Sequence, residues 1–165
     1  MRVSLEEVPQ SAKPTLANLL ELDIHDLAEL EERQIGEDGR YGYRYLDDYW
    51  LDAGRHAFFI RDDGRLSGFA LIRRGSLISA DPDTMDMCEF FVLKGCRRKG
   101  VGQAAALKVL DRYRGDWEVR VHAANAVGQR FWRTILGRLA LDSLEERRLN
   151  DERWHGSVWA LNYPA

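Results

Sequence analysis

The run of residues best suited to chemistry joins three consecutive cations to two closely spaced glycines. Arg97-Arg98-Lys99 precedes Gly100-Val101-Gly102. The segment that follows, QAAALKVLDRY, predicts a helix, because alanines favour helical structure and its apolar positions share one face. The first N–H groups of a helix have no partner within it, and the helix dipole adds positive potential there. Glycines also let the backbone approach a ligand closely. This segment therefore predicts an anion site suited to a pyrophosphate.

Other phosphate-binding turns fit this segment less well. A P-loop needs Gly-Lys-Ser/Thr, which the sequence lacks. Gly100-x-Gly102-x-x-Ala105 satisfies the dinucleotide-binding fingerprint, but residues 94–99 separate it from the preceding strand, and the next strand ends in His122 rather than in an acidic residue. A solvated basic turn is the plain alternative. The spacing therefore favours a phosphate ligand other than a dinucleotide.

The segments around this loop show the periodicities of an α/β protein. Apolar residues at helical spacing predict helices over 12–32, 100–113 and 125–136, with Asn125 as N-cap and Gly137 as the C′ residue. Strands are expected over 1–8, 56–61, 66–73, 84–93, 117–122 (after a Gly115-Asp116 turn), 138–149 and 153–162, and a short helix over 47–51. Residues 62–64 form a hairpin turn, and the glycine-rich region 36–45 a loop. This order predicts a mixed α/β sheet rather than a regular doubly wound one.

Length and composition bound the class of protein. The 165 residues, 45% of them hydrophobic, suffice for a core of their own, so we expect a single domain over 1–165. No apolar run approaches the length of a membrane span, and the first residues lack the basic and apolar stretches of a signal peptide. Cys88 and Cys96 show no metal-ligand spacing with His122. We therefore expect a cytoplasmic protein without a membrane segment, a disulfide framework or a metal site.

The net charge of −3 is unevenly distributed along the chain. Residues 1–55 hold 13 acidic and six basic side chains, a net charge of −7, whereas residues 56–165 have a net charge of +4. The sequence pI of about 5.8 argues against a nucleic-acid-binding protein. The asymmetry fits two different ligands, or simply two solvated faces of unlike charge.

Two spaced motifs resemble the GCN5-related N-acetyltransferase (GNAT) family. Val92-x7-Gly100-x-Gly102, with Arg97 before it, matches the family signature R/Q-x-x-G-x-G/A. Asn125-x-x-Gly128-x-x-Phe131-Trp132 follows the next strand, where the family often has Asn-x-x-Ala-x-x-Phe/Leu-Tyr. The resemblance covers residues 56–137, and EFFV, RRKGVG, GDWEV and FWR look like a bacterial group whose acceptors are mostly unassigned. It implies a mixed, mostly antiparallel sheet flanked by helices, and transfer of an acetyl group to an amine.

The resemblance also implies acetyl-CoA as the acyl donor. The amides of one strand end would pair with the pantetheine arm, the loop 97–103 would hold the pyrophosphate, and two residues of the next motif would line the other side. The implied cofactor-binding residues are Phe90, Phe91, Val92, Arg97, Arg98, Lys99, Gly100, Val101, Gly102, Gln103, Asn125 and Trp132. The amine would attack the thioester directly, aided by proximity and by a backbone N–H at the developing oxyanion.

The acid and the base of such a reaction are ambiguous in this sequence. Family bases usually lie an even number of residues before Val92, which fits Asp86, whereas Glu89 would face the other way unless a bulge changes the phase. Asp86 could instead be a strand-start residue and Glu89 a buried, paired carboxylate, and a water chain to a carboxylate would also suffice. Trp132 stands where the family has a Tyr acid, and an indole cannot release a proton at neutral pH. Asp86 and Glu89 are the candidate catalytic residues.

The glycine-rich loop carries Tyr41, Tyr43 and Tyr45, and the family places its acceptor site near it. These tyrosines could line a substrate pocket or pack locally. The expected acceptor is a small-molecule or peptide amine, with no nucleic-acid or membrane partner, and a homodimer is compatible with the sequence. A CoA-binding module without turnover is the alternative function. A bulky residue at Gly102 is expected to block the phosphates and spare the fold.

Overall fold

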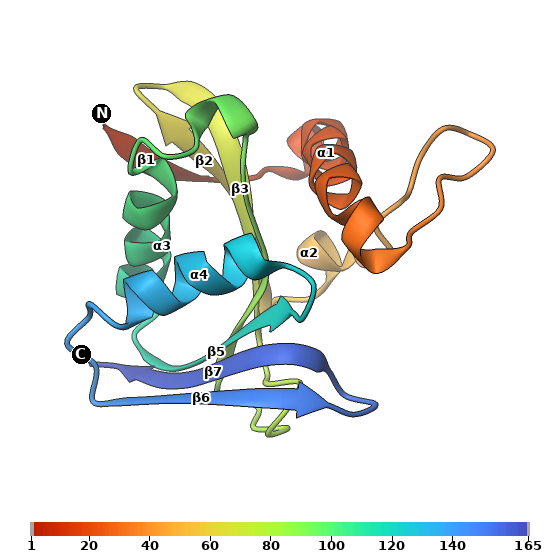
Figure 1. Cartoon of the computed structure of the whole chain (residues 1–165). Helices are drawn as coiled ribbons and strands as arrows, with labels where there is room; N and C mark the ends of the chain where they lie inside the picture. Colours follow the sequence, from red (N-terminus) through yellow and green to blue (C-terminus); the bar gives the residue numbers. More distant parts are fainter. Residues whose placement is uncertain (1, 165) are drawn as a thin grey trace.

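The computed structural model describes residues 2–164, which form seven strands and four α-helices around one sheet (Figure 1). In chain order these are β1 (Val3–Glu7), α1 (Lys13–Glu31), α2 (Asp48–Leu51), β2 (Arg55–Asp62), β3 (Arg65–Arg74), β4 (Met85–Val92), α3 (Val101–Arg112), β5 (Gly115–His122), α4 (Ala126–Leu136), β6 (Ser143–Asn150) and β7 (His155–Tyr163), with single 3₁₀ turns η1 (Gln10–Ala12) and η2 (Lys94–Cys96). The strand order is β1-β2-β3-β4-β5-β7-β6. Only β4 and β5 pair in parallel among these neighbours, so the sheet is mixed and mostly antiparallel, as the sequence predicts.

Helices cover both faces of the sheet, because successive strand residues point to opposite sides (Figure 1). On one face, Ile72 of β3 and Met87 of β4 pack into the cluster formed by α3 and α4. On the other face, Leu71 of β3 and Phe91 of β4 pack against α1 and α2. These are named the α3/α4 face and the α1/α2 face.

The sheet divides between its two parallel strands. β4 and β5 pair only over Met85–Met87 and Trp117–Val119. Beyond this point β4 continues along β3 to Val92, and β5 continues along β7 to His122. The facing edges of the two strands are therefore unpaired there, as at the edge of a sheet. This opening, named the fork, lies at the carboxyl ends of both strands, from which the chain enters α3 and α4.

Three local details differ from the expectations. Gly137 ends α4 with a φ of −67°, so it is not the left-handed C′ glycine that the sequence predicts. The first of the two final strands begins at Ser143 rather than at 138, because residues 137–142 carry the chain from α4 back to the sheet. Gly115 and Asp116 lie within β5 rather than in a turn before it.

Candidate functional site

The basic loop leads into a helix start with free amides. Arg98 and Gly100 have left-handed backbone conformations, with φ of 61° and 83°, and α3 begins at Val101 without a side-chain cap. Among the described residues, the N–H groups of 98–103 find no protein acceptor; the next amide, that of Ala104, donates to the Gly100 carbonyl at 3.0 Å. The ammonium of Lys99 folds back and donates to the Gly95 carbonyl at 2.8 Å. The groups that this loop leaves available to an anion are therefore mainly backbone N–H groups.

The Arg97 side chain ties the loop to the rest of the molecule. Its Nε donates to the Val92 carbonyl at 2.6 Å, and its Nη2 donates to Asp26 of α1 at 2.8 Å. Lys94 forms a second ion pair with Asp26 at 2.9 Å. Burial opposes ionisation of Asp26, but hydrogen bonds from Lys94 and Arg97 outweigh it and lower the pKa of this carboxyl. Arg97 therefore anchors the end of β4 to α1, and its own N–H donates to the Lys94 carbonyl at 3.2 Å.

Aromatic rings line the α3/α4 side of the fork. Phe90 of β4 meets Phe131 and Trp132 of α4, with ring centroids 5.7 and 5.3 Å apart. Trp132 is buried in the core cluster, so its indole packs against β4. Of the residues implied to bind the donor, the structure brings Phe90, the loop 97–103 and Trp132 to the same opening.

Asn125 is the N-cap of α4, as its position predicts. Its Oδ1 accepts a hydrogen bond from the Gly128 N–H at 2.8 Å. The side chain folds so closely over the helix start that a Cβ at Gly128 would lie 2.7 Å from Asn125 Nδ2. Glycine therefore fits here, where the family often has alanine.

A β-bulge decides how the two candidate bases lie relative to each other. In the ladder with β3, Glu89 lies opposite Leu71 and Met87 opposite Ile72, so Cys88 is an extra residue in β4. Glu89 lies on the α1/α2 face together with Leu71 and Phe91, and the extra residue changes the phase only of the part of β4 that precedes it. Asp86, opposite Arg73, lies on that same face, whereas Val92 packs with Val101 of α3 on the other. The bulge therefore turns Asp86, six residues before Val92, away from the face of Val92, whereas Glu89 lies on the face opposite Val92 as simple alternation predicts.

Asp86 is enclosed by two guanidinium groups. It is fully buried, accepts from Arg73 Nε at 3.0 Å and accepts from Arg120 Nη2 at 2.7 Å. Arg120 also pairs with the buried Glu118 at 3.0 Å. Burial disfavours the charged form of Arg120, but the Asp86 and Glu118 carboxylates outweigh this and raise its pKa. Both oxygens of Asp86 are thus occupied by neighbours within the sheet.

The three loop tyrosines occupy different environments. Tyr43 packs on the α1/α2 cluster, and the Glu89 carboxylate lies near it. Burial, and next the Glu89 carboxylate, raise the pKa of Tyr43, which keeps its phenol protonated. The Tyr41 hydroxyl instead lies 3.1 Å from His25 Nδ1. Tyr45 is exposed, with the Arg55 guanidinium over its ring. The structure therefore brings only Tyr43 to a candidate base.

Two residues that the sequence does not single out lie beside Tyr43 on the α1/α2 face. Tyr49 of α2 is buried, its hydroxyl makes no hydrogen bond of regular geometry, and burial together with nearby Cys88 raises its pKa. Arg55 of β2 lies over the Tyr49 ring at 5.5 Å and pairs with Asp48 at 3.7 Å. The sequence carries no signal for Tyr49 beside Cys88, because this contact joins the separate segments α2 and β4, and none for Arg55, whose contacts form only when the chain turns between α2 and β2. His122, considered only as a metal ligand, ends β5 beside the fork on the α1/α2 face.

A surface hollow of about 290 Å³ lies away from these residues, between the segment 78–84 and strands β6 and β7. It contains none of the candidate donor or acceptor residues. Within residues 2–164, no three His, Cys, Asp or Glu side chains gather as a metal site requires. No helix in that range combines the length and apolarity needed to cross a membrane.

Comparison with solved structures defines the class of the fold. An acetyltransferase from Thermus thermophilus matches with a TM-score of 0.72 at 13% identity, over 99% of this chain and 97% of that one. The PaiA N-acetyltransferase from Thermoplasma acidophilum, in complex with coenzyme A, matches with a TM-score of 0.64 at 12% identity, over 99% of this chain and 100% of that one. The ribosomal-protein-S18-alanine N-acetyltransferase from Escherichia coli matches with a TM-score of 0.59 at 13% identity, over 99% of this chain and 96% of that one. The chain therefore has the fold of acetyltransferases.

The family follows from the sequence match. The model of the acetyltransferase (GNAT) family matches residues 22–147, and the chain belongs to this family. The matched range includes the second half of α1, the basic loop, the fork and α4, which confirms the resemblance that the two motifs carry. A search of curated proteins finds no match.

Proposed function

We propose that this protein transfers the acetyl group of acetyl-CoA to an amine, which attacks the thioester while both substrates are bound. The fork beside the uncapped start of α3 carries this proposal. It offers unpaired strand edges to a pantetheine arm, and free amides with a basic run to a pyrophosphate. Membership of the GNAT family supports acetyl transfer, and the coenzyme A complex of the PaiA enzyme supports the donor.

The donor-binding residues act mainly through their backbone in this proposal. The edge of β4 from Phe90 to Val92 takes the pantetheine arm, and the amides of Arg98, Lys99, Gly100, Val101, Gly102 and Gln103 hold the pyrophosphate. Phe90 and Trp132 supply apolar walls. Asn125 shapes the start of α4 rather than offering its carbonyl oxygen to a ligand, because Gly128 already donates to it.

Glu89 is the better placed of the two candidate bases. An acceptor that arrives as an ammonium must lose a proton before its nitrogen can attack. Glu89 lies on the α1/α2 face next to Tyr43, whereas both oxygens of Asp86 are engaged by Arg73 and Arg120. We therefore assign proton removal to Glu89, directly or through water, and a structural role to Asp86.

The thiol chemistry favours direct transfer over an acetylated enzyme. Burial raises the pKa of the Cys88 thiol to about 12, so at neutral pH it is protonated and a weak nucleophile. Cys96 packs against the cluster of Val92 and Val101, away from the α1/α2 face. Since Trp132 cannot donate a proton, the CoA thiolate leaves without a side-chain acid and takes a proton from water.

The acceptor class is an amine on a small molecule or a peptide. Structural neighbours include a ribosomal-protein alanine N-acetyltransferase and a spermidine/spermine N-acetyltransferase from Vibrio cholerae, which span both kinds. The test is release of CoA from acetyl-CoA by the purified protein with a panel of polyamines, amino-acid amides, peptide N-termini and lysine peptides. Amine-dependent release, matched by acetylated amine in mass spectra, supports the proposal. Binding of acetyl-CoA without release for any amine would instead identify a binding module without turnover.

A further inference from the structure

The fork has a closed end, at which its two parallel strands meet. β4 and β5 pair up to Met87 and Val119, and beyond these residues their facing edges separate. The free amides of 98–103 lie at the other, open end, because the chain reaches them only after Val92, the last residue of β4. A donor whose pyrophosphate is held by these amides therefore extends its thioester toward the closed end.

The backbone of β4 shows where the pantetheine arm of such a donor would pair. The Leu93 N–H donates to the Ser67 carbonyl at 2.9 Å, so the backbone groups of Leu93 face β3. In an antiparallel ladder, successive residues alternate between facing the partner strand and facing away from it. The backbone groups of Val92 and Phe90 therefore face the fork, which agrees with the hydrogen bond from Arg97 Nε to the Val92 carbonyl. Phe90 is the inner of these two positions, so the acyl group lies beyond it, at the closed end.

Three aromatic rings, named the aromatic triad, close the α3/α4 side of this end. The ring centroids of Phe90 and Phe131 are 5.7 Å apart, and that of Trp132 lies 5.3 Å from each of them. All three separations fall within the range that paired aromatic side chains prefer. Trp132 is buried in the core cluster that also contains Met87 and Val119, whereas Phe90 and Phe131 are half-buried. The triad therefore joins the closed end of the fork to the core.

Neighbouring elements hold the triad in place. A Cβ at Gly102 would lie 3.0 Å from Phe131 Cε2, so α3 packs closely against the Phe131 ring. Trp132 follows Phe131 in α4, the start of which is capped by Asn125, and Phe90 belongs to β4. Moving one ring therefore disturbs contacts among β4, α3 and α4. Close-packed protein interiors respond to the addition of even one methylene group.

We propose that the aromatic triad restricts the acyl group of the donor to acetyl, with Trp132 as the specificity-determining residue. This inference rests on the proposed donor site. The α1/α2 side of the fork must stay open to the acceptor and to Glu89, so the acyl chain is left with the α3/α4 side. A propionyl or butyryl group carries further methylenes, each of which must displace a ring that its neighbours hold.

Binding of acyl-CoAs without an amine tests this assignment by calorimetric titration. For the parent protein we expect a Kd for propionyl-CoA about tenfold above that for acetyl-CoA, the discrimination that one methylene can give, and a still higher Kd for butyryl-CoA. Trp132→Phe replaces the indole by a smaller ring, so its Kd for propionyl-CoA should approach its Kd for acetyl-CoA. The Kd for CoA itself, which has no acyl group, should not change. A variant that weakens CoA and every acyl-CoA equally would show only a structural role and overturn the proposal.

Trp117→Phe is the matched control. Trp117 is a buried tryptophan of the same core cluster, but it lies near the start of β5, opposite Met85 and away from the opening of the fork. This variant should keep the parental preference for acetyl-CoA. If it relaxed the preference as Trp132→Phe does, the cause would be a looser core, which contradicts the proposal. If Trp132→Phe does not fold, Phe90→Leu replaces it, since it shortens a half-buried member of the triad and should act in the same direction.

These titrations also separate the inference from the proposed function. Equal Kd values for acetyl-CoA, propionyl-CoA and butyryl-CoA in the parent, or a preference that Trp132→Phe leaves unchanged, overturn the role of the triad and leave acetyl transfer in place. A preference that Trp132→Phe relaxes, in a protein that acetylates no amine, supports the role of the triad and rejects the transfer. A parent that binds neither CoA nor any acyl-CoA overturns both.

Discussion

Arg97 offers an anion neither its guanidinium, which is engaged by Asp26 and by the Val92 carbonyl, nor its N–H, which donates to the Lys94 carbonyl at 3.2 Å. The motif alone indicates three cations around a phosphate group. In the folded protein, one of the three side chains anchors the loop to α1 and Lys99 folds back onto Gly95. In the proposed donor site, anion binding by this loop therefore depends more on amide N–H groups at the start of α3 than on side-chain charge.

Gln103→Glu tests this dependence at the level of one residue. Gln103 is exposed in the first turn of α3. A carboxylate there would interact favourably with the helix dipole but would repel a pyrophosphate. We expect the apo protein to keep or slightly raise its Tm, while the Kd for CoA rises about tenfold. Calorimetric titration with CoA measures the effect. Gln10→Glu in η1 makes the same charge change away from the loop and should bind CoA as the parent does.

Asp86→Asn separates a structural carboxylate from a catalytic one. Removing one member of a buried ion-pair network leaves Arg73 and Arg120 without their shared carboxylate, which costs about 3–5 kcal/mol of unfolding free energy in comparable cases. Urea unfolding measures the loss. Asp83→Asn is the control, because its ion pair with Arg74 is exposed and should contribute less than about 1 kcal/mol. An Asp86→Asn protein of parental stability but without activity would return Asp86 to the role of base.

At the scale of elements, the spacing of apolar residues predicts most helices and strands, but it does not predict which face the first part of β4 presents to each side of the sheet. Helices α1, α3 and α4 and the β2–β3 hairpin follow from apolar spacing and turn residues, and Asn125 follows from cap chemistry. The bulge at Cys88 leaves no trace in the alternation of β4, because it depends on pairing with β3. The cluster of Tyr43 and Tyr49 cannot be predicted from the sequence either, since the loop before α2, α2 itself and β4 come together only in the fold.

Gly102 has a packing role that the sequence does not reveal. A Cβ at this position would lie 3.0 Å from Phe131 Cε2 and 3.5 Å from Val92 Cγ2, so a bulky residue would have to displace the Phe131 ring, which argues against the expectation that it spares the fold. Gly102→Val should weaken CoA binding and also lower the unfolding free energy by about 1–3 kcal/mol, through overpacking. Gly95→Val is the control, because nothing lies within 4 Å of its Cβ position. Parental stability of Gly102→Val in urea would contradict the packing account.

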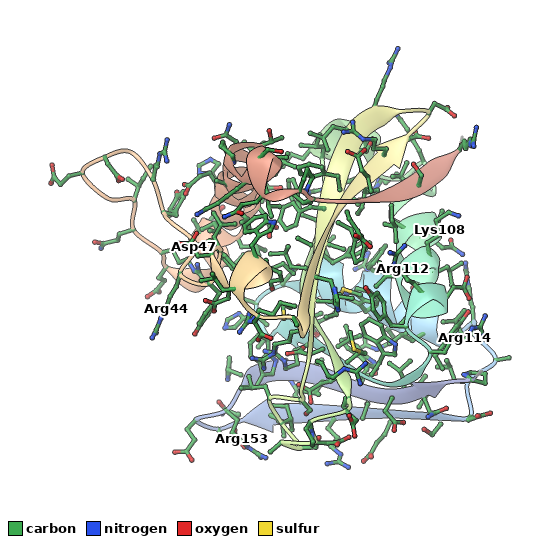
Figure 2. The ribbon with its side chains drawn as sticks, turned by 180° about the vertical axis from the view of Figure 1, so that it is seen from behind. Arg44, Asp47, Lys108, Arg112, Arg114 and Arg153 are labelled. Atoms are coloured by element: carbon green, nitrogen blue, oxygen red, sulfur yellow. The ribbon has the colours of Figure 1, made fainter. Side chains whose placement is uncertain are left out.

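At the scale of the molecule, folding neutralises much of the acidic charge of residues 1–55. Asp47 pairs with Lys13, Asp48 with Arg55, and Asp26 with Lys94 and Arg97. Figure 2 shows Arg44 and Asp47 near the α1–α2 loop, and Lys108, Arg112 and Arg114 on the side of α3. The basic side chains beside α3 therefore lie away from the α1–α2 loop, and fewer carboxylates of residues 1–55 are free than the sequence suggests.

This distribution predicts a modest preference for cationic acceptors. An ammonium is attracted to the acidic side by a field that salt screens, with a Debye length of about 8 Å near 0.15 M. With acetyl-CoA saturating, kcat/KM for the best amine should fall severalfold between low and high salt, and a carboxylate-rich amine should be poorer. A flat salt profile with equal use of an acidic acceptor would show that this charge has no part in recognition.

The measurement that tests the account most directly is amide hydrogen exchange with and without acetyl-CoA at about 1 mM. Ligand bound at the fork should slow exchange of residues 98–103 and of the free edge of β4 up to Val92, because their N–H groups gain acceptors. The edge strand β6, on the far side of the sheet, should exchange as before and serves as the internal control. Protection confined to other segments, or none at a concentration that raises the Tm, would show that acetyl-CoA does not bind at the fork.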